Sequence, residues 1–470
     1  MSTSPSPNKA FYQALVMVIG GLSVGILVLA LLVTTSGPRV RQVAVQNQSG
    51  DRISSVGQGL TVVFDRPIEG TDFESVIEVE PEVDYTVSHR QGQLSITFDQ
   101  NLLSNTEYVL TVKPEIEDDL GKRMEREYNY EFTTEEPSFT YLERNYGRGK
   151  EAVDRVVQRA PLSGKRQVLF GEDRIKSFAL NGRYLAVVVV RPDNTDELRV
   201  VDLSSTEERS VDISHNAQVD NLRFSPTDNQ FIFVLQEVGP STGDPESEGF
   251  DSNRLYLYDI DGEQLQPVDT SSDKGNVKSA LYSSDGQALL YETLDGSYYL
   301  TGATRATETT PLGIYHDSGG FDRTNTKIAF QFGDSVTIYD AQAKESQELS
   351  QIGTGARISA PTFLHNSEEL IYLWDPLNAK VGTTTRVYVA SPDGKVEEQV
   401  VESQPQEHFL DYPVISYDDR YVLVEAAPKS SDLDDYTGNR QPEDAQLVLY
   451  DRFDGKVIDE IRGIDPVWNR

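Results

Sequence analysis

The residues of this chain that could do chemistry are few and widely spaced. Gly239, Ser241 and Gly243 match the G-x-S-x-G pattern of a serine hydrolase, whose nucleophile lies on a turn between a strand and a helix. An apolar run, FIFVLQEV, precedes this pattern, but GDPESEGF follows it, and its proline and two glycines disfavour a helix. No catalytic residue is therefore predicted, and we expect the chain not to be an enzyme.

The residues that could bind a metal are equally dispersed. No histidine has a second histidine two or four residues away, so none predicts a metal site on a single strand or helix. Asp432, Asp434 and Asp435 could supply oxygen ligands to calcium, but they lack the glycine and glutamate of the calcium-binding loop. No cofactor is expected, and calcium at these aspartates is the alternative left open. The histidines are His89, His215, His316, His365 and His408.

The composition narrows the class of protein and its partners. The chain carries 42 lysines and arginines against 76 aspartates and glutamates, a net charge of −34, which argues against nucleic acid as a partner. It has no cysteine, so it forms no disulfide and holds no thiolate metal site. A secreted eukaryotic protein of this size would usually contain disulfides, and their absence favours a bacterial cell envelope.

The N-terminal segment is apolar enough to reach across a lipid bilayer. No charged residue occurs between Ala10 and Pro38, and the apolar core at residues 14–33 would span about 30 Å as a helix. This core is longer than that of a cleaved signal peptide, so we expect an uncleaved transmembrane helix. Residues 1–13 would form a short cytoplasmic tail, and the rest of the chain would lie outside the cell membrane.

Residues 38–136 show the pattern of a small β-sandwich. Short runs of alternating apolar and polar residues are separated by turns rich in glycine, aspartate and proline. The segments LTVVFDRPIE, SITFDQNLLSNTEYVLTVKPEIEDDLGKRM and YEFTT resemble the bacterial Ig-like domain described in S-layer proteins. This resemblance implies a spacer or adhesion module without catalytic residues. It is also the main reason to place the C-terminal part of the chain outside the cytoplasm.

Residues 138–470 repeat one four-stranded unit, which predicts a β-propeller. Each unit has an apolar strand, a polar turn, a very apolar strand and then a strand that ends in an acidic residue, as in FSPTDNQFIFVLQ followed by LYLYDID. These units resemble TolB-like and WD-type propeller repeats. Six units are clear. Three further strands precede them and would form a seventh unit that lacks its first strand, which the C-terminal segment GIDPVWNR would supply. We therefore expect an all-β fold with seven blades, six or eight being the alternatives.

Two acidic insertions interrupt the repeat, at residues 237–253 and 427–446. Both fall between the second and third strands of their units, and in a propeller such connections emerge on one face. Long loops on a rigid scaffold commonly carry binding residues. The candidate ligand-binding residues are Asp244, Glu246, Glu248 and Asp251 in the first insertion, and Asp432, Asp434, Asp435 and Tyr436 in the second.

Together these features favour a membrane-anchored extracytoplasmic binding protein. The helix would anchor the chain in the bilayer, the Ig-like domain would hold the propeller away from it, and one propeller face would bind a protein or glycan of the envelope. The sequence leaves two alternatives open, because propellers host many unrelated activities. One is an extracytoplasmic propeller enzyme, such as a polysaccharide lyase or hydrolase, and the other is a TolB-like envelope assembly factor.

Overall fold

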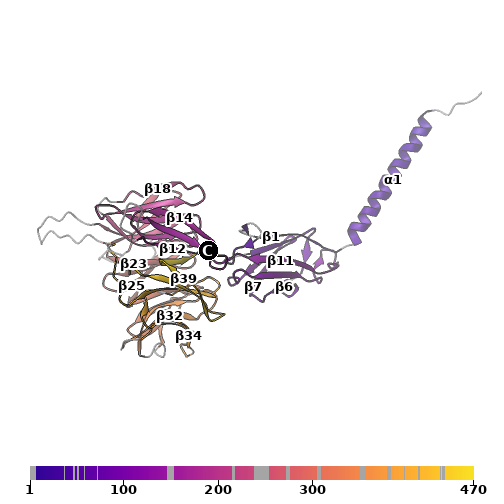
Figure 1. Cartoon of the computed structure of the whole chain (residues 1–470). Coiled ribbons are helices and arrows are strands. Elements are labelled where there is room, and N and C mark those ends of the chain that lie inside the picture. The colour runs from indigo at the N-terminus through magenta and orange to yellow at the C-terminus, as the bar shows by residue number, and fades with distance from the viewer. Residues whose placement is uncertain are drawn as a thin grey trace, which may run out of the picture. The chain divides into compact units, whose positions relative to one another are not determined.

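The computed structural model contains two compact units, Met1–Glu135 and Glu136–Arg470 (Figure 1). The residues that the structure describes are 7–35, 37–45, 48–49, 52–57, 59–70, 72–145, 153–213, 217–237, 253–270, 276–303, 309–349, 355–377, 383–395, 397–410, 413–434, 436 and 440–469.

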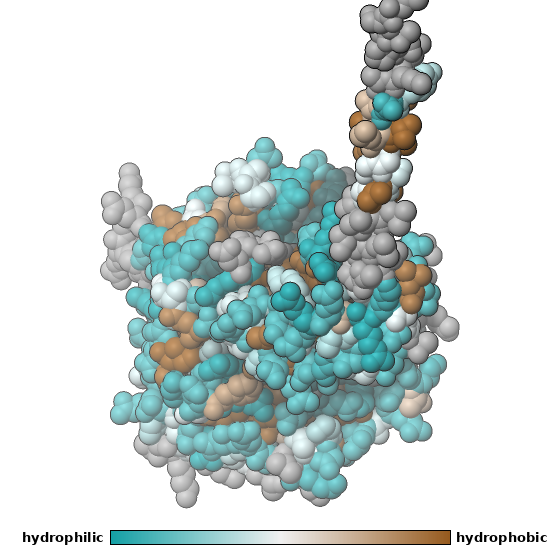
Figure 2. All heavy atoms as spheres, turned by 90° about the vertical axis from the view of Figure 1, so that its right-hand side faces the viewer, coloured by the Kyte–Doolittle hydropathy of each residue, from teal (hydrophilic) through white to brown (hydrophobic). Residues whose placement is uncertain are grey.

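The first unit begins with a long helix, α1 (Pro7–Thr35), which contains the apolar segment at residues 14–33. Its only proline is its first residue, where a missing amide hydrogen costs no helical hydrogen bond. The described side chains of α1 run from Phe11 to Ile26 and are all exposed, and many of them are hydrophobic (Figure 2). Within the part of the chain that the structure describes, no helix is long and apolar enough to cross a membrane.

The remainder of the first unit is a sandwich. Its strands are β1 (Val40–Val45), β2 (Gln48–Ser49), β3 (Arg52–Ile53), β4 (Gly59–Phe64), β5 (Ile68–Glu69), β6 (Ile77–Glu80), β7 (Tyr85–Arg90), β8 (Gln93–Phe98), β9 (Glu107–Val112), β10 (Glu117–Asp118) and β11 (Tyr128–Thr134), with the short 3-10 helix η1 (Glu74–Val76) before β6. One sheet has the order β1-β4-β8-β7 and the other β2-β3-β11-β9-β6, while β5 pairs with β10. Every second side chain of a strand points into the core between the sheets, as in β8, where Leu94, Ile96 and Phe98 are buried.

The second unit is a β-propeller, whose described residues form seven antiparallel sheets. The first holds β12 (Phe139–Glu143), β13 (Asp154–Arg159), β14 (Arg166–Glu172) and β40 (Ile464–Trp468), the second β15 (Ile175–Leu180), β16 (Tyr184–Val190), β17 (Asp196–Asp202) and β18 (Glu208–Ser210), and the third β19 (Ala217–Phe224), β20 (Gln230–Glu237), β21 (Arg254–Asp259) and β22 (Gln264–Pro267). The fourth holds β23 (Val277–Tyr282), β24 (Ala288–Thr293), β25 (Ser297–Gly302) and β26 (Thr310–Ile314), and the fifth β27 (Asp317–Phe321), β28 (Lys327–Phe332), β29 (Ser335–Asp340) and β30 (Glu345–Leu349). The sixth holds β31 (Ala356–Phe363), β32 (Leu370–Pro376), β33 (Arg386–Ala390) and β34 (Glu397–Glu402), and the seventh β35 (Glu407–Phe409), β36 (Val414–Ile415), β37 (Tyr421–Pro428), β38 (Gln446–Asp451) and β39 (Lys456–Arg462).

The last strand of the chain completes the first sheet. β40 pairs antiparallel with β12, with Phe139 opposite Trp468 and Leu142 opposite Ile464. The rings of Phe139 and Trp468 meet edge to face, and both side chains are buried. The prediction that the C-terminal segment supplies the missing leading strand is therefore confirmed.

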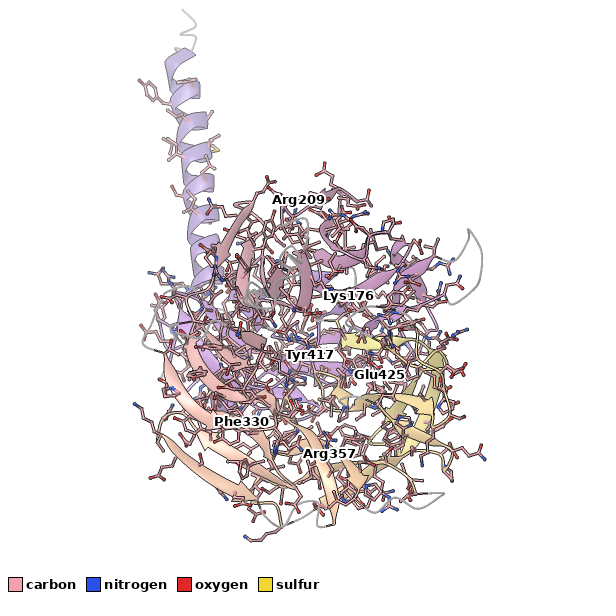
Figure 3. The ribbon with its side chains drawn as sticks, turned by 90° about the vertical axis from the view of Figure 1, so that its left-hand side faces the viewer. Lys176, Arg209, Phe330, Arg357, Tyr417 and Glu425 are labelled. Carbon is pink, nitrogen blue, oxygen red and sulfur yellow. The ribbon has the colours of Figure 1, made fainter. Side chains whose placement is uncertain are left out.

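In several sheets burial is greatest in the second strand and least in the outermost strand, and this explains the very apolar runs in the sequence. All seven residues of β16, the second strand of its sheet, are buried, because neighbouring sheets cover both of its faces. By contrast, β18 at the outer edge of the same sheet has no buried residue. In the second sheet, Lys176 of the first strand lies toward the middle of the ring seen in Figure 3, whereas Arg209 of the outermost strand lies at its edge.

The strand order gives the second unit two distinct ends. At the end that we call the insertion end, second strands pass to third strands, and both insertions occur at such connections, between β20 and β21 and between β37 and β38. The predicted position of the insertions within their sheets is thus confirmed. At the opposite end, which we call the turn end, first strands turn into second strands, as at Asn181 and Gly182 between β15 and β16.

Candidate functional site

The residues predicted to bind a ligand have different positions in the structure. In the first insertion, Asp244, Glu246, Glu248 and Asp251 lie outside the described residues, as do Ser241 and, in the second insertion, Asp435. Asp432 is exposed, but Asp434 and Tyr436 are buried, with 4% and 6% of their surfaces accessible.

Asp434 is held by an arginine from the first sheet. Arg144, which follows β12, donates from Nη1 to Asp434 Oδ2 at 2.6 Å, and both side chains are about 1% exposed. Its Nη2 donates to the carbonyl oxygen of Lys176 at 3.0 Å, and its guanidinium lies 3.9 Å from the centre of the Tyr436 ring. The second insertion is therefore fastened to the first and second sheets by a buried cation.

Tyr436 fastens the same insertion to β13. Its hydroxyl donates to Asp154 Oδ2, and Asp154 also accepts the backbone amides of Asn145 and Ile175, each at 2.9 Å. Burial raises the pKa of Asp154, although these hydrogen bonds oppose the shift. Burial and the neighbouring Asp154 carboxylate raise the pKa of Tyr436, so its hydroxyl stays a neutral donor. Asp434 and Tyr436 thus have partners within the fold.

A buried lysine, which the sequence analysis missed, lies beside this network. Lys176 Nζ is 3.0 Å from Asp196 Oδ2 and 2.9 Å from Asp220 Oδ1, and the Lys176 side chain is 2% exposed. Burial raises the pKa of Asp196, and the charge of Lys176 opposes that shift. The available signal was a lone lysine in the otherwise apolar start of the strand IKSFAL. Lys176 lies toward the middle of the ring in Figure 3, as does Glu425 of β37 in the seventh sheet. Arg209, in the outer strand β18, lies at the edge of the ring.

Exposed apolar side chains recur at the insertion end. Leu294, Phe332 and Leu377 are 57%, 53% and 58% exposed, and each lies where a second strand passes to a third. They belong to three consecutive sheets, the fourth, fifth and sixth. Each has an exposed aspartate within two residues, Asp295, Asp334 and Asp375 respectively. We call these three connections the apolar–acid turns.

Tyr315 contacts both of the first two apolar–acid turns. Ile314, which is 65% exposed, precedes Tyr315, whose amide donates to the Gly296 carbonyl oxygen beside Leu294. The Tyr315 ring stacks on Phe330 with 4.1 Å between ring centres and lies edge-on to Phe332 at 6.3 Å. The partly buried Tyr315 ring, stacked on buried Phe330, therefore supports the exposed ring of Phe332.

The turn end holds a pocket of about 220 Å³. Its walls come from the ends of β15, β19 and β40 and from the connection between β36 and β37, where Tyr417 lies (Figure 3). Phe178, Leu180, Phe224 and Trp468 give it an apolar lining, and Arg223 stands among them. Across the described residues, no group of three His, Cys, Asp or Glu side chains is placed to hold a metal ion.

Comparison with known proteins identifies one part of the chain. Residues 34–134 match the family model of the bacterial Ig-like domain, and this match lies within the first unit. The resemblance of that segment to bacterial Ig-like domains is thereby confirmed. A search of the curated proteins found no match to the chain.

Several solved structures are similar to the chain at low identity. A prolyl endopeptidase is 13% identical, with a TM-score of 0.48 over 84% of this chain and 50% of its own. The oligogalacturonate lyase of Vibrio parahaemolyticus is 12% identical, with a TM-score of 0.43 over 68% of this chain and 84% of its own. The propeller domain of the Trilobed protease from Pyrococcus furiosus is 11% identical, with a TM-score of 0.43 over 70% of this chain and 96% of its own. These TM-scores are too low to support an argument about activity.

Proposed function

We propose that this chain is a membrane-anchored extracytoplasmic binding protein, and that the insertion end of its propeller binds another protein of the envelope. The observation that carries the proposal is the set of apolar–acid turns. Leu294, Phe332 and Leu377 occupy the same connection in three consecutive sheets, and each stands beside an exposed aspartate.

Single exposed apolar residues are common on soluble proteins. What supports an interaction surface here is their repetition at the same connection in three consecutive sheets. Burying a leucine or phenylalanine side chain stabilises a complex by about 1.5 to 3 kcal/mol relative to leaving it in water. The adjacent aspartates favour a partner that presents lysine or arginine next to its apolar residues. Such pairing selects the partner and its orientation more than it adds affinity.

The scaffold suits this role because it is rigid. We take each of the seven sheets as one blade, so that the pairing of β40 with β12 closes a seven-bladed ring. The buried contacts of Arg144, Asp434 and Tyr436 fasten the second insertion across the place where the first and last blades meet. A surface carried by such a ring loses little conformational freedom when a partner binds.

The anchoring and location rest on the sequence and on the Ig-like match. The charge-free stretch from Ala10 to Pro38 lies largely within α1, and the chain has no cysteine. An Ig-like domain between an anchor and a propeller would act as a spacer. Assembly of envelope complexes, the TolB-like alternative, would be one form of the same protein-binding function.

Site-specific crosslinking in cells tests the proposed face. We would place p-benzoylphenylalanine at Leu294, Phe332 or Leu377 in the full chain and identify adducts by mass spectrometry. The matched control is Val457, a 47% exposed residue in the outer strand β39. One discrete protein adduct at the three turns and none at Val457 is the expected result. Equal crosslinking at Val457, or no adduct at any turn, would contradict the proposal.

A further inference from the structure

The turn end of the second unit holds a pocket that the proposed protein-binding face does not use. We propose that this pocket binds an aromatic carboxylate, with the ring against Phe178, Phe224, Tyr417 and Trp468 and the carboxylate at Arg223. The inference is independent of the proposed function, because it concerns the opposite end of the ring.

The size of the pocket suits one aromatic ring with a small polar group. Its volume is about 220 Å³. An apolar cavity of about 150 Å³ is known to hold a benzene molecule, so this pocket has room for a substituted ring. Rings and aliphatic side chains line most of it, and they would replace water around the faces of a bound ring.

The charges around the pocket favour an anion, although the chain as a whole repels anions. Acidic residues outnumber basic ones by 76 to 42, yet none of the described residues that line the pocket is acidic. Arg223 is exposed, and its Nη1 donates to the Leu222 carbonyl oxygen at 3.4 Å, a long hydrogen bond. No carboxylate of the described residues forms an ion pair with it. A guanidinium in this setting can bind a carboxylate through two donors.

The walls of the pocket are held in place before any ligand arrives. The Trp468 indole donates from Nε1 to the Val414 carbonyl oxygen at 3.0 Å, and its ring meets that of Phe139. The Tyr417 ring lies 4.7 Å from the His365 ring. Asn469, at the rim, donates from Nδ2 to Ser138 Oγ at 2.8 Å. A preformed pocket avoids the entropy cost of ordering its side chains on binding.

The test uses the full chain in detergent with Trp374→Phe, which leaves Trp468 as the only tryptophan. The probe is 4-nitrobenzoate, whose nitro-substituted ring quenches tryptophan emission at short range. We expect saturable quenching, about tenfold weaker with the neutral isostere 4-nitrobenzamide. Arg223→Gln should weaken 4-nitrobenzoate about tenfold and leave 4-nitrobenzamide unchanged, because a charge-assisted bond of about 1.5 kcal/mol is lost.

Arg323→Gln is the matched control, since Arg323 is an exposed arginine in the turn between β27 and β28 at the same end. It removes the same charge without touching the pocket and should leave both affinities unchanged. Absence of saturable quenching, or equal affinity for 4-nitrobenzoate and 4-nitrobenzamide, overturns the proposal. An equal loss of 4-nitrobenzoate affinity with Arg323→Gln overturns it too, because the net charge of the protein would then explain the effect.

The same chemistry could come from a free small molecule or from a polypeptide that ends in an aromatic residue. N-acetylglycylphenylalanine and its C-terminal amide distinguish these sources by competition with 4-nitrobenzoate. Displacement by the peptide acid but not by the amide supports the proposal with a polypeptide C-terminus as ligand. Failure of both peptides, with saturable binding of 4-nitrobenzoate retained, supports the proposal with a free aromatic acid.

Discussion

At the scale of single residues, the insertion end is stabilised by buried charges whose partners lie far apart in the chain. Arg144 and Asp434 are 290 residues apart, yet their side chains form a buried ion pair. The sequence pattern marked Asp434 as a candidate ligand-binding residue in an acidic insertion and as a possible calcium ligand. Neither its burial nor its partner could be predicted, because both depend on how the first and last sheets meet.

The first prediction concerns this ion pair. Asp434→Asn removes the charge that compensates buried Arg144, so we expect the propeller to lose about 3 kcal/mol of stability. The measurement is the thermal unfolding transition followed by circular dichroism. Asp432→Asn is the control, because Asp432 is exposed in the same insertion and its replacement should change stability by less than about 0.5 kcal/mol. Equal effects of the two substitutions would show that the ion pair does not fasten the insertion.

The second prediction concerns Asp419, in the turn before β37. Its carboxylate accepts the amides of His365 and Asn366, each at 2.7 Å. Burial raises the pKa of Asp419 to about 6 from an ordinary 3.8, and the charge of Asp418 adds to the shift, while Arg452 and the two amides oppose it. The folded state therefore keeps a proton that the unfolded state has lost, and stability from this group falls as pH rises from about 4 to 6.

Comparison with Asp419→Asn isolates this contribution from that of carboxylates with a lowered pKa, which make stability rise with pH instead of fall. Hydrogen bonds lower the pKa of Asp118 and Asp285, for example, although burial opposes this at both residues. We expect the melting temperature of the native chain, relative to that of Asp419→Asn, to fall between pH 4 and pH 6.5. A difference that stays constant over this range would mean that Asp419 titrates alike in the folded and unfolded states.

At the scale of elements, the closing strand β40 joins the two ends of the propeller. Trp468 is 4% exposed and packs against Phe139 and Tyr421, whereas Trp374 in β32 is only partly buried. Trp468→Ala should therefore destabilise the propeller by about 3 to 5 kcal/mol, the usual range for a buried aromatic residue. Trp374→Ala should cost clearly less. Urea unfolding of both variants measures the difference, and equal costs would argue that β40 is not essential for closure.

Most of these elements could be predicted, because strands and turns depend on neighbouring residues. The second strands, such as YLAVVVV in β16, are apolar on both faces and stand out from the chain. The C-terminal strand was predictable as well, since the first sheet lacked a leading strand in the sequence. In the first unit, the two-residue strands β2, β3, β5 and β10 were not predictable as separate elements, because pairs this short depend on the strands beside them.

The sequence analysis missed both the pocket at the turn end and the apolar–acid turns, for a related reason. Leu294, Phe332 and Leu377 each look like the apolar end of a buried strand, and only the structure shows that their side chains are exposed. The pocket is lined by β15 and β19, near the start of the second unit in the sequence, and by β40, the last strand of the chain. Insertions stand out in the sequence because they interrupt the repeat. A surface formed by connections of regular length has no such local signal, so it could not be predicted.

At the scale of the whole molecule, the absence of cysteine allows a direct test of topology. A single cysteine can replace Ser4, before α1, or Ser205, an exposed residue between β17 and β18. If the N-terminal helix is an uncleaved anchor, a membrane-impermeant maleimide should label cysteine at 205 in intact cells whose outer barrier admits the reagent. It should label cysteine at 4 only after the membrane is lysed.

A charge-free stretch lies between the two cysteine positions. Residues 10–38 contain no charge, and a helix of this length would cost much free energy to hold in water but little in a bilayer. Charge bias sets the orientation only weakly, since Lys9 precedes the stretch and Arg39 and Arg41 follow it. Labelling at both positions in intact cells would mean that the helix does not span the membrane. Labelling only at 4 would reverse the orientation and place the propeller in the cytoplasm, where binding of an envelope protein at the apolar–acid turns would be impossible.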